Sequence, residues 1–230
     1  MPTIIILHGW KSSKEKWQKV KQSLEIDGFE VIAPDLPGFK KETKLKQPWK
    51  LDDYVSWVKE LVDAQHVENF FLLGHSFGGR IAIKLASEGF KELKALILVA
   101  SAGIQEKKFC FGEIVRALRI YKCPWWPFFR KCFYRFILRK TDYLNVSGAL
   151  KETMKNVLKE DLTDLLEKIE VPTYIIWGKK DKLTPLRHGL LMKEKIKNSE
   201  MDILKGIGHT PYLEDPKLLS DKIRNYVSKF

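Results

Sequence analysis

The chain alternates short apolar runs with longer segments in which apolar residues recur every three or four positions. Most of the apolar runs are continuous rather than alternating with polar residues, which predicts strands buried on both faces of a sheet. These candidate strands are residues 3–7, 29–33, 70–73, 95–99, 173–177 and 201–204. The amphipathic segments predict helices at residues 13–26, 51–64, 79–87, 186–197 and 216–228. Strand and helix in regular succession are typical of an α/β fold with a parallel sheet.

The regular succession is interrupted once, between about residues 103 and 171. This stretch is too long for a simple crossover connection, and its own apolar spacing is helical. We therefore expect a single domain over residues 1–230, with a lid inserted at about residues 104–168.

Composition places the chain among soluble globular proteins, since 44% of its 230 residues are hydrophobic and 30% are charged. No apolar run approaches the ~18 residues of a membrane span, and no basic segment precedes the first strand, so neither a span nor a signal peptide is expected. Cys110, Cys123 and Cys132 lack the spacing of a zinc site, and their odd number argues against a disulfide framework. These features predict a cytoplasmic protein without a metal.

One motif lies between a predicted strand and a predicted helix, Gly-His-Ser-Phe-Gly at residues 74–78. A serine at the tip of so sharp a turn has a strained backbone, and Gly74 and Gly78 must lack side chains for the turn to close. The turn exposes the serine hydroxyl at a helix N-terminus, where the helix dipole favours a developing negative charge. Ser76 is therefore the candidate nucleophile.

A nucleophilic serine needs a histidine as base and an acid that orients the histidine. In this kind of fold the acid and then the histidine follow the serine, each after a later strand. Only one of the five histidines, His209, follows the last predicted strand, and Asp181 follows the strand at 173–177. Either residue alone would more often be an ordinary loop residue. Their occurrence in the required order at the required strand ends predicts a Ser76–Asp181–His209 triad.

Acyl transfer also needs donors for the oxyanion. The backbone N–H of Phe77, directly after the nucleophile, is one candidate. The other is the backbone N–H of Trp10, because Gly9 allows the loop after the first strand to turn toward Ser76. The alternative is that His8 and Gly9 form only a turn that ends the strand.

The predicted lid concentrates both charge and aromatic residues. Ten Lys and Arg residues face three acidic ones between residues 105 and 143, which is +7 of the chain's net +12. The aromatic side chains expected to line the substrate pocket are Trp125, Trp126, Phe129, Phe133 and Phe136. The aromatic side chains either pack on the rest of the domain or line an apolar acyl pocket. The basic face is either solvated or meets an anionic lipid surface or an acidic carrier protein. Nucleic-acid binding is not expected, because no recognised module accompanies the charge.

These motifs together resemble the α/β-hydrolase superfamily, in the branch of small lid-bearing serine esterases. The resemblance covers nearly the whole chain, through HGW at 8–10, APDLPGF at 33–39, GHSFGG at 74–79, VPTYIIWGKKD at 171–181 and GIGHTPYLEDP at 206–216. HGW with Trp17 downstream is similar to bacterial carboxylesterases, including those that cleave pimeloyl-carrier-protein methyl esters. Serine rather than aspartate at position 76 argues against the haloalkane dehalogenase and epoxide hydrolase branches.

The resemblance implies an α/β-hydrolase fold with about six strands, mostly or wholly parallel, helices on both faces and a helical lid before the acid-bearing strand. Family members usually carry a β-hairpin ahead of the HG strand, which this sequence lacks, so one sheet edge should be less protected. We expect a carboxylic ester hydrolase that forms an acyl-enzyme intermediate on a small-molecule substrate without a cofactor. The alternatives are a C–C bond or thioester hydrolase with the same triad, and a ligand receptor or scaffold that does not turn over.

Overall fold

The structure is a computed structural model and describes residues 1–40, 42–105 and 148–230. At its centre is one sheet of six strands in the order β2-β1-β3-β4-β5-β6, and every neighbouring pair is parallel. The strands are β1 (Thr3–Leu7), β2 (Glu30–Ile32), β3 (Phe70–His75), β4 (Leu93–Val99), β5 (Thr173–Gly178) and β6 (Ser199–Leu204). The predicted six-stranded parallel sheet is confirmed, and each predicted strand is present with small changes at its ends.

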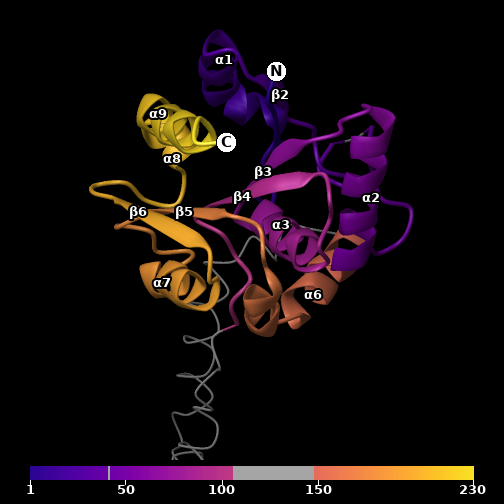
Figure 1. The fold of residues 1–230 in the computed structure, drawn as a ribbon. Coiled ribbons are helices and arrows are strands. Elements are labelled where there is room, and N and C mark those ends of the chain that lie inside the picture. The colour runs from indigo at the N-terminus through magenta and orange to yellow at the C-terminus, as the bar shows by residue number, and fades with distance from the viewer. Residues whose placement is uncertain (41, 106–147) are drawn as a thin grey trace, which may run out of the picture.

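Helices cover both faces of the sheet (Figure 1). One face is covered by α1 (Gln18–Ile26) and α9 (Pro216–Val227), and the other by α2 (Leu51–Ala64), α3 (Phe77–Ser87) and α7 (Leu186–Lys195). The predicted helix at 13–26 is two elements, a 3₁₀ turn η1 (Lys14–Trp17) followed by α1. The sequence pattern does not predict the short helix α8 (Pro211–Glu214).

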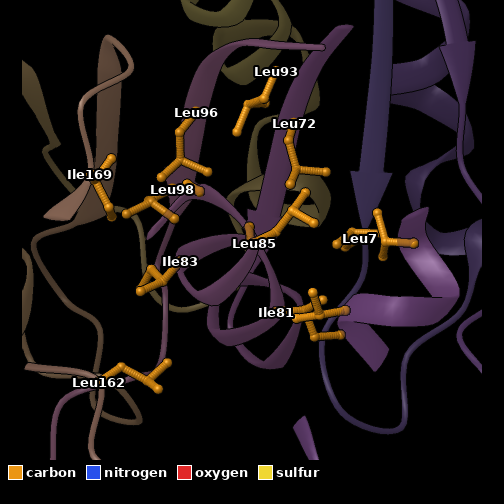
Figure 2. Close-up of a cluster of buried hydrophobic side chains, with 14 of the residues drawn as sticks. Leu7, Leu72, Ile81, Ile83, Leu85, Leu93, Leu96, Leu98, Leu162 and Ile169 are labelled. Carbon is orange, nitrogen blue, oxygen red and sulfur yellow. The ribbon is translucent and has the colours of Figure 1, made fainter. Parts of the chain in front are cut away.

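The core consists of two apolar layers separated by the sheet. Alternate strand residues enter opposite layers, so Ile4 and Ile6 pack with α1 and α9, whereas Ile5 and Leu7 pack with α2 and α3. Figure 2 shows the second layer, in which strand and helix residues meet: Leu7, Leu72, Ile81, Ile83, Leu85, Leu93, Leu96, Leu98, Leu162 and Ile169. Each fully buried aliphatic side chain stabilises the fold by about 1.5–3 kcal/mol.

Only the two ends of the predicted insertion at 104–168 fall within the described residues. Its last part forms α6 (Ala149–Lys159) and a 3₁₀ helix η4 (Thr163–Lys168). Val157, Leu162 and Leu166 from this part are buried in the same layer as α2 and α3. The predicted pocket residues Trp125, Trp126, Phe129, Phe133 and Phe136 lie outside the described residues, as do the three cysteines.

The parallel arrangement brings the candidate site together. The strand register pairs Leu7 with Gly74, His75 with Val99, and Gly178 with Leu204. The loops that follow β1, β3, β5 and β6 therefore start at the same edge of the sheet, which is where ligands bind in open α/β sheets. No helix of the described ranges is long and apolar enough to span a membrane.

Candidate active site

Ser76 forms a strained turn between β3 and α3. Its φ of 51° and ψ of −111° are rarely adopted by a residue with a side chain, and such a conformation costs ~1–3 kcal/mol. The serine N–H donates to the carbonyl of Val99 at 3.2 Å, and its carbonyl accepts from the N–H of Ala102 at 3.0 Å. A Cβ on Gly78 would lie 2.1 Å from the carbonyl oxygen of Leu7. The neighbouring strands thus hold the turn. The short distance between Gly78 and the backbone of Leu7 explains why the motif has glycine at position 78.

His209 and Asp181 are hydrogen-bonded between the loops that follow β6 and β5. Nδ1 of His209 lies 2.8 Å from Oδ2 of Asp181, whose side chain is fully buried. The N–H groups of Leu183 and Thr184 donate to Oδ1 at 2.8 and 3.0 Å. Burial alone raises the pKa of Asp181, but the hydrogen bonds from His209 and Thr184 outweigh it and hold this pKa below its usual range. An ionised Asp181 favours the tautomer of His209 with its proton on Nδ1, which leaves Nε2 as an acceptor.

Thr184 supports the acid and was missed by motif reasoning. Its buried hydroxyl lies 2.7 Å from Oδ2 of Asp181 and 3.1 Å from the carbonyl oxygen of Ala100. An aspartate that accepts from N–H groups two and three residues ahead forms an Asx-type turn. The Asp-Lys-Leu-Thr run at 181–184 therefore carried a signal for this support.

Several hydrogen bonds attach the loop that carries His209, including one from the N–H of Lys180 to the carbonyl of Ile207 at 2.8 Å. Glu214 of α8 accepts from the N–H of Gly208 at 2.7 Å. His75, which directly precedes the serine, donates from Nε2 to the carbonyl of His209 at 2.8 Å, and the two imidazole centroids are 5.0 Å apart. These contacts put the predicted base beside the predicted nucleophile. In the described part of the chain no hydrogen bond joins the Ser76 hydroxyl to His209, a contact that often tightens only when substrate binds.

The predicted oxyanion donors flank the serine. A Cβ on Gly9 would lie 3.3 Å from Cβ of Ser76, so the loop after β1 lies directly beside Ser76. The rings of Trp10 and Phe77 meet edge to face with centroids 5.1 Å apart. Phe77 is the first residue of α3, where the helix has no acceptor for its N–H. The described residues provide no acceptor for the N–H of Phe77 or of Trp10.

Aromatic rings extend from these two residues along one side of the site. Trp10 contacts Phe39 at a centroid distance of 4.9 Å, Phe77 contacts Tyr54 at 5.0 Å, and Tyr54 contacts Trp49 at 4.9 Å. All three contacts are edge to face, the geometry that aromatic pairs prefer. The sequence analysis did not relate Trp10 to these rings, because the loop after β1, Phe39 and the start of α2 meet only in the folded chain.

The other described histidines have different surroundings. His8 is buried, donates from Nδ1 to the carbonyl of Gly9 at 2.8 Å and accepts at Nε2 from the N–H of Leu36 at 2.9 Å. Burial lowers the pKa of His8. The neutral ring therefore joins the loop after β1 to the loop after β2 through these two hydrogen bonds. His66 lies before β3, and His188 lies on α7. Within residues 1–40, 42–105 and 148–230, no group of three or more His, Cys, Asp or Glu side chains is arranged to hold a metal ion.

The six-stranded parallel sheet, the serine turn after β3 and the aspartate–histidine pair after β5 and β6 define an α/β hydrolase. The family model of the α/β hydrolase fold matches residues 2–136, and the chain belongs to this family.

Relatives that match most of the chain include lipases. Lipase 3 of Moraxella sp. is 26% identical over 93% of this chain and 73% of its own length. The AB hydrolase superfamily protein YisY of Bacillus subtilis is 27% identical over 99% of this chain and 90% of its own length. An esterase of Exiguobacterium antarcticum has the same fold, with a TM-score of 0.76 and 24% identity over 99% of this chain and 92% of the esterase. Among these, the lipase supports ester hydrolysis in general as the class of reaction.

Proposed function

We propose that the chain is a serine hydrolase that cleaves carboxylic esters with the triad Ser76, His209 and Asp181. The observation that carries the proposal is the hydrogen bond between Asp181 and His209, which is 2.8 Å long. The loop of His209 is also hydrogen-bonded to His75, the residue before the strained Ser76. Acyl transfer requires a buried acid, an oriented imidazole and a serine at the edge of the sheet where the substrate binds.

In the acylation step, Nε2 of His209 accepts the hydroxyl proton of Ser76 while Oγ attacks the ester carbonyl carbon. The carbonyl oxygen gains the negative charge and receives hydrogen bonds from the N–H groups of Trp10 and Phe77. Asp181 keeps the imidazole in its tautomer and stabilises the imidazolium that forms. When the tetrahedral intermediate collapses, His209 gives its proton to the leaving alcohol, and the acyl group stays on Ser76.

In the deacylation step the same groups act on water. His209 accepts a proton from a water molecule, and the resulting hydroxide attacks the acyl carbonyl carbon. The oxyanion again forms between the two N–H groups. Collapse returns the proton from His209 to Oγ of Ser76 and releases the carboxylic acid. No step requires a metal or a redox cofactor.

The aromatic side of the site favours an apolar acyl group. The rings of Trp10, Phe39 and Phe77 contact one another beside the loops of Gly9 and Ser76, and they carry no charge. Burying each methylene of an acyl chain against such a surface is worth ~0.8 kcal/mol. The name of the Moraxella relative, a lipase, agrees with an apolar acyl group.

Ester turnover with p-nitrophenyl esters from C2 to C16 tests the proposal. We expect Ser76→Ala to lower kcat by about 10⁴–10⁶ and Asp181→Asn by about 10⁴, with folding retained in both. A fluorophosphonate probe should label Ser76 of the wild type and leave Ser76→Ala unlabelled.

Two outcomes would contradict the proposal. Substantial turnover by Ser76→Ala would remove Ser76 from its role. A wild type that binds esters but hydrolyses neither oxygen esters nor thioesters would favour the ligand-receptor alternative, and faster thioester turnover would shift the substrate class.

A further inference from the structure

His75 is a buried imidazole that the proposed proton transfers do not use. It is the last residue of β3 and is 2% exposed. The ring of Tyr212 meets it edge to face with centroids 4.9 Å apart, and the ring of Trp17 lies at 5.8 Å. An apolar side chain would fill such a place without the cost of burying a polar ring, so the polar atoms of His75 need an explanation.

The hydrogen bond of His75 fixes its tautomer. Nε2 lies 2.8 Å from the carbonyl oxygen of His209, and because a carbonyl oxygen only accepts, Nε2 carries the proton. Nδ1 faces Gly9, where an added Cβ would lie 2.9 Å away. Burial, followed by the neighbouring His209, lowers the pKa of His75 to about 3. The ring therefore stays neutral near pH 7 and presents its single N–H to His209.

We infer that His75 is a positioning residue, whose Nε2–H holds the main chain of His209 at a fixed place relative to the adjoining Ser76. The inference rests on the proposed function, because this distance matters only if His209 takes the serine proton. Asp181 fixes the side chain of His209 at Nδ1, and His75 fixes its backbone carbonyl. Two attachment points on one residue define the direction of the imidazole, and thus keep Nε2 aimed at the hydroxyl.

The origin of each support separates His75 from the other contacts of this loop. Glu214 comes from α8, five residues after His209, so it shapes the loop internally and moves with it. His75 comes from β3 in the middle of the sheet and is bonded covalently to Ser76. Among these supports, only His75 links the loop of His209 directly to the residue that precedes Ser76.

Three substitutions test the inference through turnover and through the rate of fluorophosphonate labelling, which does not depend on the substrate. His75→Leu removes the N–H, and because displacing reacting groups by ~1 Å costs about 10²-fold, we expect kcat to fall about 10- to 100-fold with KM within about threefold. His75→Gln places an amide N–H near the position of Nε2 and should restore kcat to within about fivefold of the wild type. His75→Asn places its amide near Nδ1 and should not restore it.

A matched control is Tyr174→Phe, which removes another partly buried hydrogen bond, 2.5 Å long to Asp202. Tyr174 lies in the same apolar layer as Trp17 and Tyr212, at the end of β5 that is remote from the site. We expect its kcat to equal that of the wild type. If His75→Leu does not fold, the Gln and Asn variants are compared with each other.

Equal kcat in the Leu variant and the wild type would overturn the inference, and so would equal kcat in the Gln and Asn variants. Either result would leave the proposed function standing as long as Ser76→Ala is inactive. Turnover by Ser76→Ala would instead overturn the proposed function, and the positioning role with it.

Discussion

Gly9 lies where the loop after β1, the proposed nucleophile Ser76 and His75 meet. An added Cβ would lie 2.9 Å from Nδ1 of His75 and 3.3 Å from Cβ of Ser76. Both neighbours lie at the end of β3, a central strand of the sheet, and are held in place. We therefore expect Gly9→Ala to move the loop and carry the N–H of Trp10 away from the serine. Loss of one oxyanion donor costs about 10²–10³ in kcat, and steady-state kinetics should give a loss of that size. An unchanged kcat would mean that Trp10 does not bind the oxyanion.

His75 makes stability depend on pH. Its pKa is about 3 in the folded protein and about 6.5 in an unfolded chain. As pH falls below ~6.5 the unfolded state binds the proton first, so the free energy of unfolding decreases down to about pH 3. At pH 5 this group accounts for a loss of about 2 kcal/mol, since each pH unit corresponds to ~1.4 kcal/mol.

Urea unfolding at pH 7.5 and pH 5.0 measures this effect. The wild type should lose about 2 kcal/mol more than His75→Gln between the two pH values, because glutamine does not titrate. The difference between the two proteins cancels groups that they share, including Asp181. Equal losses would show that His75 is not kept neutral by the fold.

At the scale of elements, α3 connects the proposed nucleophile Ser76 to the end of the predicted insertion. The guanidinium of Arg80, 4% exposed, donates to the carbonyls of Val157, at 2.6 Å, and Glu160. These carbonyls belong to the C-terminus of α6, where a cation also interacts favourably with the helix dipole. Lys84, one turn further along α3, lies 2.6 Å from the carboxylate of Glu160. The segment that returns from the insertion is therefore fastened to the helix that begins after Ser76.

Removing the guanidinium should destabilise this connection. Arg80→Leu leaves the carbonyls at the end of α6 without their charged donor, and hydrogen bonds to charged groups contribute ~1.5–3 kcal/mol. We expect the free energy of unfolding in urea to fall by about 2–3 kcal/mol. The control is Lys59→Met, which breaks an exposed ion pair with Glu88 and should cost less than ~1 kcal/mol. Equal effects of the two variants would contradict the role of Arg80.

At the scale of the whole molecule, the sheet separates two apolar layers that share its strands. Leu85 lies in the layer with α2 and α3, and Leu219 in the layer with α1 and α9, both fully buried. Because adjacent strand residues belong to both layers, we expect the molecule to unfold as one unit. Leu85→Ala and Leu219→Ala should each lower the free energy of unfolding by ~2–5 kcal/mol without changing the urea dependence of a single transition. A second transition in either variant would indicate separate folding units.

The local pattern predicted the elements and the chain order of the proposed serine, acid and base. Apolar runs predicted all six strands, and most clearly β1, β3 and β5, which are buried along their whole length and have few polar positions. Glycines at positions 74 and 78 predicted the turn at Ser76, since only that geometry needs both to lack a side chain. Asp181 and His209 were predictable because the chain order of the acid and the base follows from the order of the strands in this fold.

Contacts between distant segments were decided by the tertiary structure. The aromatic side of the site combines Trp10, Phe39 and Tyr54, which no local spacing relates. The hydrogen bond from His75 to His209 joins residues 134 positions apart, and its direction follows from burial, which removes water as an alternative partner. Sequence determines what a segment prefers to be, whereas the surroundings of a side chain, and therefore its charge and its role, exist only when the strands are assembled.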